Sequence, residues 1–304
     1  MTRVLTQSEL TTFMRDRRQW YLGYYRSLRK RYDTPYLPTV GTLVHYGLES
    51  YYRQKDEHPV DAVKGRAMFL IDRNPEAAET IAEAAGLAGI MLEGYLDWVE
   101  ETGADAVLDV YAAEETVEVQ LSPHPFILRG KIDARARDSF TGAHIQLEHK
   151  TVGSLADLPK TAQSSFQFLT YDLLAYLKSV ETSEHAYRTD GVLLNMLRRV
   201  KRTARAKPPF YGRHIVRHNT NELRNHWRHV VGIAQEIERT TSRLNAGEDH
   251  HMVCPPTVTR DSAWQNPFLP VYQLMDDGSD AEGMLAEEYE THDPNERYTP
   301  EEDA

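Results

Sequence analysis

Two carboxylates and a lysine lie on neighbouring segments of the sequence, in a pattern that could hold a metal ion against a phosphate. Asp133 ends the run Gly130-Lys131-Ile132-Asp133, and Glu148 and Lys150 lie in Leu147-Glu148-His149-Lys150-Thr151. Side chains alternate between the two faces of a strand, so Glu148 and Lys150 share a face, and Asp133 lies on the polar face of residues 127–137. A turn-like segment at 138–142 would join both strands into a hairpin with all three groups on one face.

This combination of groups is typical of phosphodiester hydrolysis. Magnesium and similar hard cations bind one or two carboxylates together with phosphate and water. Such an ion polarises the phosphoryl group and lowers the pKa of bound water, while a nearby lysine stabilises charge that develops on the phosphate. Taken alone, the pattern also fits a surface hairpin with an ordinary ion pair, so the metal site needs further motifs to support it.

Four further motifs accompany the hairpin in a fixed order along the chain. They are an N-terminal segment at 5–25 that contains Arg18-Gln19-Trp20-Tyr21, the helix start Gly41-Thr42-Leu43-Val44-His45, the element Gln167-Phe168-Leu169-Thr170-Tyr171, and the C-terminal Ser262-Ala263-Trp264-Gln265-Asn266-Pro267-Phe268. Together the five motifs resemble the PD-(D/E)xK nuclease superfamily. The resemblance is specifically to its RecB-like branch, which includes CRISPR-associated and bacteriophage exonucleases.

The resemblance implies a role for each site residue. It implies that the metal ligands are His45, Asp133, Glu148 and the main-chain carbonyl of His149. Lys150 would be the catalytic lysine beside the catalytic carboxylates Asp133 and Glu148. Gln167 and Tyr171, which share a helix face at positions i and i+4, would contact DNA or order water. Because an imidazole ligand suits manganese better than magnesium, we expect activity with either Mg²⁺ or Mn²⁺.

The chain departs from the family in its cysteines. Many RecB-like exonucleases carry an iron–sulfur cluster, which requires four thiolates, whereas this sequence has the single cysteine Cys254. Asp16, Ser262 and Asn266 occupy positions where the family has cysteines. We therefore predict no iron–sulfur cluster. Polar contacts and the packing of Trp264 and Phe268 are candidates for what ties the C-terminal arm to the N-terminal helix.

The net charge of −11 comes from the C-terminal segment, whereas residues 1–275 are neutral overall and contain clusters of basic residues. Residues 276–304 hold twelve acids and one base, which leaves 34 acids and 34 bases in residues 1–275. Bases dominate residues 15–31 and 198–217, and such clusters attract phosphate backbones. The expected DNA-contacting residues are Arg17, Arg18, Arg199, Arg202 and Arg205. The alternative for the second cluster is a solvated loop, while Tyr32 and Tyr36 beside the first could stack on bases.

The acidic segment 276–304 has the composition of a disordered tail. It could mimic DNA and compete for the basic clusters, or it could simply favour solubility. The sequence leaves both interpretations open.

The expected fold is mixed α/β, with a restriction-endonuclease-like core sheet that is flanked by helices. We expect a nuclease domain at 1–275, divided into an inserted helical subdomain at about 50–105, a core at about 106–246 and an arm at 247–275. The expected helices span 6–28, 41–54, 60–73, 76–101, 160–179 and 219–246. The expected strands span 111–121, 126–137, 144–150, 186–198 and 210–217, and the remainder is expected to be coil.

The sequence therefore predicts a metal-dependent DNA exonuclease that acts on single-stranded or end-bearing DNA in recombination, repair or end processing. A non-catalytic DNA-binding adaptor and a structure-specific endonuclease are the alternatives. A recombinase or a single-strand-binding protein is a candidate partner, and a homo-oligomer stays open. The chain has no phosphate-binding loop, dinucleotide fingerprint or His-Glu-x-x-His pair. One cysteine and no long apolar run favour the cytoplasm of a bacterium or a phage-infected host, without membrane association.

Overall fold

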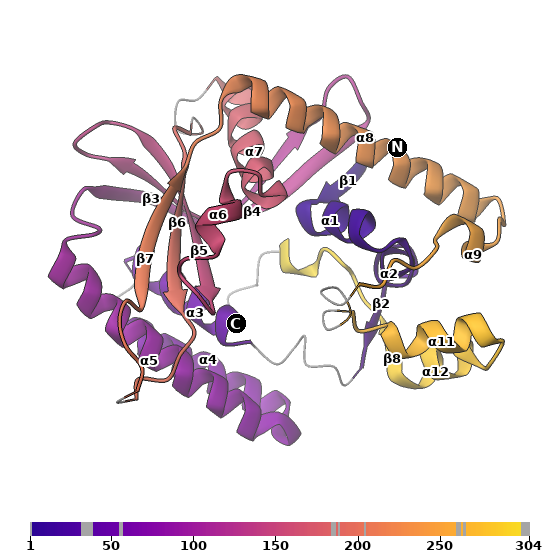
Figure 1. Cartoon of the computed structure of the whole chain (residues 1–304), viewed down its shortest axis with the longest axis horizontal. Coiled ribbons are helices and arrows are strands. Elements are labelled where there is room, and N and C mark those ends of the chain that lie inside the picture. The colour runs from indigo at the N-terminus through magenta and orange to yellow at the C-terminus, as the bar shows by residue number, and fades with distance from the viewer. Residues whose placement is uncertain are drawn as a thin grey trace. The chain divides into compact units, whose positions relative to one another are not determined.

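The structure is a computed structural model in which residues 2–31, 39–54, 57–183, 187, 189–203, 205–259, 263 and 266–298 are described. The chain divides into two compact units. The first unit comprises residues 1–33, 118–130 and 224–304, and the second comprises residues 34–117 and 131–223. Every residue of the predicted metal site falls in the second unit. The chain trace is shown in Figure 1.

Three helices form one layer of the second unit. They are α3 (Val40–Tyr52), α4 (Pro59–Arg73) and α5 (Ala78–Thr102), with a short 3₁₀ turn at Pro75–Ala77. Thr39 caps α3 by accepting a hydrogen bond from the Thr42 amide, while Pro59 occupies the first turn of α4. Gly47 lets α3 approach α5, because a Cβ at this position would clash with the Leu92 side chain. These helices correspond to those expected at 41–54, 60–73 and 76–101.

The strands are β3 (Leu108–Gln120), β4 (Phe126–Asp138), β5 (His144–Val152), β6 (Val192–Arg198) and β7 (Tyr211–Val216). The sheet order of these strands is β4–β5–β6–β7, and β3 also pairs with β4. The β4–β5 and β6–β7 pairs are antiparallel, whereas β5 and β6 are parallel. This is the mixed sheet flanked by helices that the sequence predicts, so the expected fold class is confirmed.

Helices cover both faces of β5 and β6. Ala134, Ala136, Ile145 and Leu147 pack in a core with α3, α4 and α5. On the opposite face, Val192, Leu194 and Met196 pack with residues of α6 (Leu158–Ala162) and α7 (Phe166–Thr182). The face that carries Glu148 is therefore buried under α7 and is not a free surface. A buried carboxylate needs hydrogen-bond partners, which α7 supplies.

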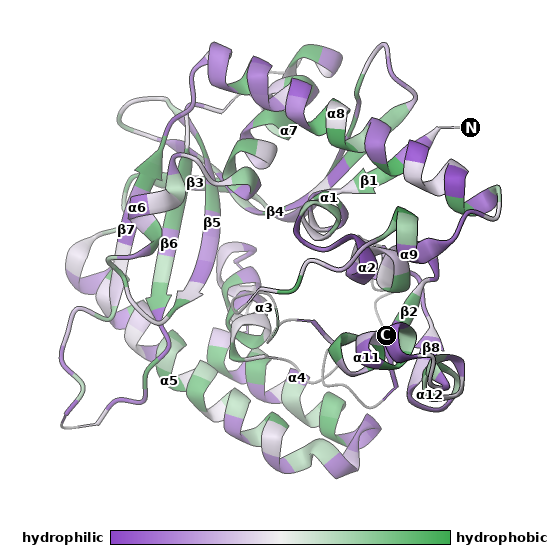
Figure 2. Cartoon of the chain, turned by 45° about the vertical axis from the view of Figure 1, so that its right-hand side comes forward, coloured by the Kyte–Doolittle hydropathy of each residue, from purple (hydrophilic) through white to green (hydrophobic). Residues whose placement is uncertain are grey.

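The first unit begins with β1 (Arg3–Thr6), which pairs with residues 126–129 of β4 in parallel. Helices α1 (Gln7–Arg15) and α2 (Arg17–Trp20) follow, then a π-helical turn at Tyr21–Tyr25 and β2 (Leu28–Lys30). The long helix α8 (Thr220–Asn245) carries hydrophilic and hydrophobic bands in Figure 2. Its buried apolar residues from Arg224 onward are Val230, Val231, Ala234 and Ile237.

The single helix expected at 6–28 is wrong because the chain leaves helical geometry at Asp16. This residue is extended, with φ −157° and ψ 108°, and its carboxylate accepts hydrogen bonds from the Arg18 and Gln19 amides. Asp16 thus begins a second helix, as an N-cap does. The helix expected at 160–179 is similarly divided into α6 and α7.

The disordered tail expected at 276–304 is wrong for residues 276–298. This segment contains the end of α11 (Leu269–Asp277), α12 (Ala281–Glu288), β8 (Tyr289–Thr291) and a 3₁₀ turn at Glu296–Tyr298. Leu285 and Tyr289 are buried in a core with Leu22 and Phe268. The acidic composition suggests disorder, but a few apolar residues of the segment pack in a core together with residues from the N-terminal part of the chain.

Several bases of the first unit pair with these acids. Arg26 forms a bidentate pair with Glu282, and β2 and β8 form an antiparallel ribbon in which Arg29 binds Glu290 at 2.7 Å. Phe268, a predicted tie of the C-terminal arm, packs in this core, whereas Tyr32, Tyr36, Ser262, Trp264 and the end of the tail lie outside the described residues. Among the helices that the structure describes, none has the length and apolar character needed to cross a membrane.

Candidate metal-centred active site

The β4–β5 hairpin positions Asp133 beside the backbone of the Glu148–Lys150 segment. The strands pair from Ala134 opposite Leu147 to Arg137 opposite His144. Just beyond this register, the carboxylate of Asp133 accepts a hydrogen bond from the His149 amide at 2.7 Å. The hairpin predicted from the alternation of side chains thus places Asp133 next to the strand that carries Glu148 and Lys150.

Helix α3 brings His45 to the same carboxylate. His45 lies on the second turn of α3, and its Nδ1 is 3.5 Å from the Asp133 Oδ2 atom. The imidazole of His45 and the imidazole of His149 meet edge to face, with their centroids 5.8 Å apart. The structure therefore brings together His45 and Asp133, which lie 88 positions apart in the sequence.

Glu114 is a third donor that the sequence analysis missed. One ligand atom each from His45, Glu114 and Asp133 lie within 4.8 Å of one another, a grouping that could hold a metal ion. Glu114 has a φ of 52°, which is rare for a residue other than glycine, and its carboxylate forms an ion pair with Lys131 at 2.7 Å. Such backbone strain concentrates at functional sites. The signal in the sequence was the pair Glu114-Glu115, which interrupts the alternation of the strand.

Glu148 lies in a second group with Lys150 and Gln167. Its Oε1 atom accepts hydrogen bonds from Lys150 Nζ at 2.6 Å and from Gln167 Nε2 at 2.9 Å. Gln167 also contacts the Tyr171 hydroxyl at 3.4 Å across one turn of α7. The structure thus brings together all four residues predicted on this side of the site, although it groups Glu114 rather than Glu148 with His45 and Asp133.

Electrostatic coupling joins the two groups. Burial and the neighbouring Asp133 raise the pKa of Glu148 above its ordinary value. Burial acts to raise the pKa of Asp133 too, but His45, His149 and Lys150 together lower it below its ordinary value. Burial alone would lower the pKa of His45, whereas Asp133 raises that pKa to about 9. The site therefore concentrates negative charge that a cation could neutralise.

A buried polar network supports the His149 ring. Tyr52 stacks on this ring with centroids 5.2 Å apart, and Asn195 Nδ2 contacts His149 Nδ1 at 3.2 Å. Burial lowers the pKa of His149 to about 3. The imidazole is therefore neutral, and its Nδ1 accepts the hydrogen bond from Asn195.

The network continues from Asn195 to a partly buried ion pair. Asn195 donates to the Tyr95 hydroxyl at 2.9 Å, and Arg213 Nε donates to Asn195 Oδ1 at 3.2 Å. Arg213 also forms an ion pair with Asp105. Strands β5, β6 and β7 and helices α3 and α5 are thus joined by polar contacts behind the site.

The predicted DNA-contacting arginines have different surroundings. Arg18 is only 2% exposed and forms an ion pair with Asp276 at 2.6 Å, so its expected role in DNA contact is replaced by a structural one. Arg17 lies over the Phe13 ring at 4.9 Å. Arg202 lies over Phe210 at 4.1 Å.

The loop that carries Arg199, Arg202 and Arg205 follows β6. Lys150 of β5 lies opposite Met196 of β6, and these two strands are parallel. Because parallel strands end at the same edge of a sheet, this loop leaves β6 at the edge where β5 ends just beyond Lys150.

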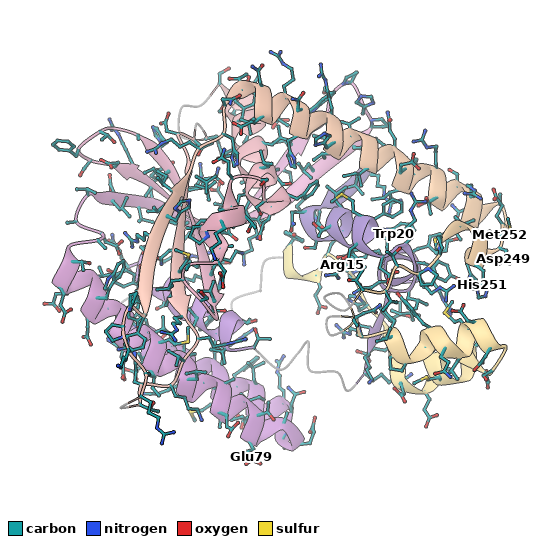
Figure 3. The ribbon with its side chains drawn as sticks, viewed as in Figure 1. Arg15, Trp20, Glu79, Asp249, His251 and Met252 are labelled. Carbon is teal, nitrogen blue, oxygen red and sulfur yellow. The ribbon has the colours of Figure 1, made fainter. Side chains whose placement is uncertain are left out.

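A second group of possible metal ligands lies in the first unit. It consists of Asp249, His250 and His251 at the start of α9 (His250–Val253), of which Figure 3 labels Asp249 and His251. Arg18 lies 3.3 Å from His251 Nδ1, and a neighbouring guanidinium disfavours a cation there. We therefore favour the group around Asp133. Cys254 is buried, and burial raises the pKa of its thiol to about 11.

Comparison with known proteins places the chain in a family. The sequence profile of the PD-(D/E)XK nuclease superfamily matches residues 4–255. The chain belongs to this superfamily. No curated protein matches the sequence.

Two solved structures match the chain at low sequence identity. One is a protein described as a "putative exonuclease" from Eubacterium rectale, with 11% identity, a TM-score of 0.48 and coverage of 81% of this chain and 82% of the other. The second, SSO0001, has 15% identity and a TM-score of 0.29, with coverage of 65% and 74%.

The donor set fits a divalent cation. Superfamily members typically use divalent metals, and His45, Glu114 and Asp133 offer one imidazole nitrogen and two carboxylates. Carboxylate oxygens suit magnesium and manganese, and the imidazole adds a preference for manganese.

Proposed function

We propose that the protein is a metal-dependent DNA exonuclease of the RecB-like type, which hydrolyses phosphodiester bonds of single-stranded or end-bearing DNA in recombination, repair or end processing. One observation carries this proposal. His45, Asp133, Glu148, Lys150 and Gln167 come from four separate elements, α3, β4, β5 and α7, and form two adjoining groups in one unit. An adaptor that no longer cleaves DNA has no need to keep this arrangement.

His45, Asp133, Glu148 and the His149 carbonyl are the proposed metal ligands, and Glu114 is a fifth candidate. A bound divalent cation would polarise the scissile phosphate and lower the pKa of the attacking water. The cation would compete with Lys131 for the carboxylate of Glu114, because Lys131 and Glu114 form an ion pair at 2.7 Å.

Lys150 is the proposed catalytic lysine. Its ammonium group is held by Glu148 at 2.6 Å and lies 5.9 Å from the centre of the Phe168 ring. Both contacts restrict where the ammonium can go, which favours a fixed position beside a phosphate oxygen. Gln167 and Tyr171 act from α7, where the amide orients the Glu148 carboxylate.

Lys131 is not proposed as a catalytic group, although it belongs to the same motif as Asp133. It pairs with Glu114 on the neighbouring strand. In the absence of a cation it neutralises part of the negative charge at the site.

The test compares linear and closed circular DNA. End-labelled linear strands and closed circles are incubated with Mn²⁺ or Mg²⁺ and with the wild-type protein, Lys150→Ala or Asp133→Ala. We expect loss of linear DNA only, and a decrease of at least about a hundredfold in the rate for each variant. Lys160→Ala is the matched control, because this lysine is exposed and pairs with Asp157 at 2.7 Å.

Three other outcomes would contradict the proposal. Nicking of the circles would indicate an endonuclease. Binding of DNA without degradation under either metal would favour the adaptor. Full activity of Lys150→Ala would remove the proposed catalytic site.

A further inference from the structure

One face of α4 alternates cationic and aromatic side chains. Arg66, Phe69 and Arg73 lie at positions i, i+3 and i+7, which fall on the same side of a helix. The guanidinium carbon of Arg66 lies 5.4 Å from the centre of the Phe69 ring, and that of Arg73 lies 4.2 Å from it. The Phe69 ring is therefore contacted by two cations.

The same array continues onto α3, the helix that also carries His45. Arg66 also lies over the ring of Tyr46, at 5.5 Å, and Tyr46 directly follows His45 in the sequence. Arg66 thus bridges the two rings. The order along the surface is Tyr46, Arg66, Phe69 and Arg73, and we call these four residues the stacking track.

Two large apolar side chains of α4 are exposed at the stacking track or next to it. Phe69 is 39% exposed, and the adjacent Met68 is 67% exposed. Packing against α3 and α5 already buries Val60, Val63 and Ala67 on the other side of α4. The exposed ring is therefore not needed for the core of the second unit.

Rings and guanidinium groups in alternation match the chemistry of an unpaired nucleic-acid strand. Bases stack on aromatic rings, arginines bind phosphates, and guanidinium planes can also stack on bases. The bases of a duplex offer no free faces along its length, so this chemistry favours a single strand. The distance from Arg66 to Arg73 is roughly 10 Å along the helix axis, enough for about three stacked nucleotides at ~3.4 Å each.

Charge limits the track at its far end. The chain after Arg73 carries Glu76 and Glu79 at the start of α5, and Figure 3 labels Glu79 at this end of the helix pair. Acidic groups repel phosphate, so the favourable surface ends at Arg73, and within it α4 also carries the exposed Asp72.

We propose that the stacking track binds a short stretch of single-stranded DNA along α4 and Tyr46 of α3, the helix that carries His45, and guides that strand toward the metal site. This inference rests on the proposed nuclease function and adds to it the path of the strand. It also specifies the chemistry of recognition, in which base stacking is independent of sequence.

The experiment measures the binding of two fluorescent probes in the presence of EDTA, so that no metal-dependent cleavage occurs. One probe is an oligothymidine of about 12 nucleotides, and the other has the same length but abasic sites in place of the bases. With the full chain, we expect Phe69→Ala to weaken oligothymidine binding by about fivefold to a hundredfold, as loss of one stacked base predicts. Binding of the abasic probe should change by less than about twofold, because it has no base to stack.

Two further variants separate stacking from folding. Phe69→Tyr keeps the ring and should bind like the wild type. Phe140→Ala is the matched control, because Phe140 is 88% exposed in the turn between β4 and β5, far along the strands from Asp133. Circular dichroism and the melting temperature of each variant exclude a general loss of structure.

Arg73 provides an independent test of the phosphate contact. Arg73→Ala should weaken the binding of both probes by a similar factor. It should also reduce the slope of log affinity against log salt by about one, as expected for one lost phosphate contact.

Several results would overturn the inference. The inference fails if the wild type does not bind oligothymidine. It also fails if Phe69→Ala lowers the affinity for both probes by the same factor, or if its affinity for oligothymidine is unchanged. A change of oligomeric state in Phe69→Ala with unchanged DNA affinity would show a protein interface instead. If the wild type binds the probes as expected but cleaves no DNA with any metal, the proposed nuclease function fails and the stacking track stands. If the wild type cleaves DNA but Phe69→Ala binds oligothymidine as tightly as the wild type does, the stacking track fails and the proposed nuclease function stands.

Discussion

At the scale of single residues, Asp133 contacts groups from two other elements of the site. Its carboxylate accepts a hydrogen bond from the His149 amide and lies 3.5 Å from the His45 ring. Glu114 joins this group from β3, while Glu148 is held by Lys150 and Gln167. Each acid is thus paired with a cation or a donor in the metal-free protein, and a bound metal would have to replace some of these partners.

The raised pKa of His45 predicts that metal binding releases a proton. Its pKa of about 9 keeps the imidazole protonated at lower pH, and a metal ligates only the neutral form. Calorimetry of Mn²⁺ binding in buffers of different ionisation enthalpy should show roughly one proton released at about pH 8, and almost none at about pH 10.5. The affinity for Mn²⁺ should rise with pH over the same interval.

His45→Ala is the control for this measurement. It should abolish most of the release at about pH 8. The same proton release in His45→Ala as in the wild type would show that this imidazole is not a ligand.

Glu114 gives a second prediction at this scale. Glu114→Gln keeps the size of the side chain but removes its charge, so the affinity for Mn²⁺ should fall by about tenfold or more. Glu118→Gln is the matched control, because Glu118 lies on the same strand but pairs with Arg129 at 2.5 Å. Equal affinities in Glu114→Gln and the wild type would exclude Glu114 from the coordination sphere.

At the scale of secondary-structure elements, the network from His149 to Asp105 fixes the site. It links β5, β6 and β7 to α3 and α5 through Asn195 and Arg213. A partly buried arginine and aspartate are costly to desolvate unless their polar groups have partners. Asn195 contacts three groups of the network at once, on Arg213, Tyr95 and His149.

Asn195→Leu should therefore be strongly destabilising. Asn195 is fully buried, and its loss leaves the Arg213 and Tyr95 groups short of a partner. We expect a loss of about 2–4 kcal/mol in the free energy of unfolding, measured by urea denaturation. Asn225→Leu on the exposed face of α8 should change it by less than about 0.5 kcal/mol, and a similarly small effect at Asn195 would contradict the role of the network.

The sequence predicts the helices and strands that have a regular apolar pattern. It does not predict features whose conformation depends on residues far away in the sequence. The alternation in 127–137 and 144–150 predicts the hairpin, and a helix start places His45 on α3. Glu114 was missed because its positive φ turns its side chain out of the alternation. Asp16 breaks a helix by capping the next one, which the apolar pattern does not reveal.

At the scale of the whole molecule, the acidic C-terminal segment is part of the first unit. Leu285 and Tyr289 complete a core with Leu22, and Glu282 and Glu290 neutralise Arg26 and Arg29. The sequence could not show this, because the apolar partners lie more than 250 residues apart. The acids around α12 and β8 thus contact some of the bases that were expected to attract DNA.

Leu285→Ala tests this integration. Truncation of a fully packed leucine should lower the free energy of unfolding by about 2–4 kcal/mol, measured by urea denaturation. The neighbouring Glu287 is exposed, so Glu287→Ala should have little effect. If Leu285→Ala is as stable as the wild type, the segment contributes nothing to the core and the tail interpretation returns.

The central claim is that a divalent cation binds where His45 and Asp133 meet. Anomalous X-ray diffraction at the manganese edge, from crystals of the full chain soaked in Mn²⁺, tests it most directly. We predict an anomalous peak within about 2.0–2.6 Å of the Asp133 carboxylate and the His45 nitrogen, and no such peak in Asp133→Ala. A peak at Asp249–His251 alone, or no peak at all, would contradict it.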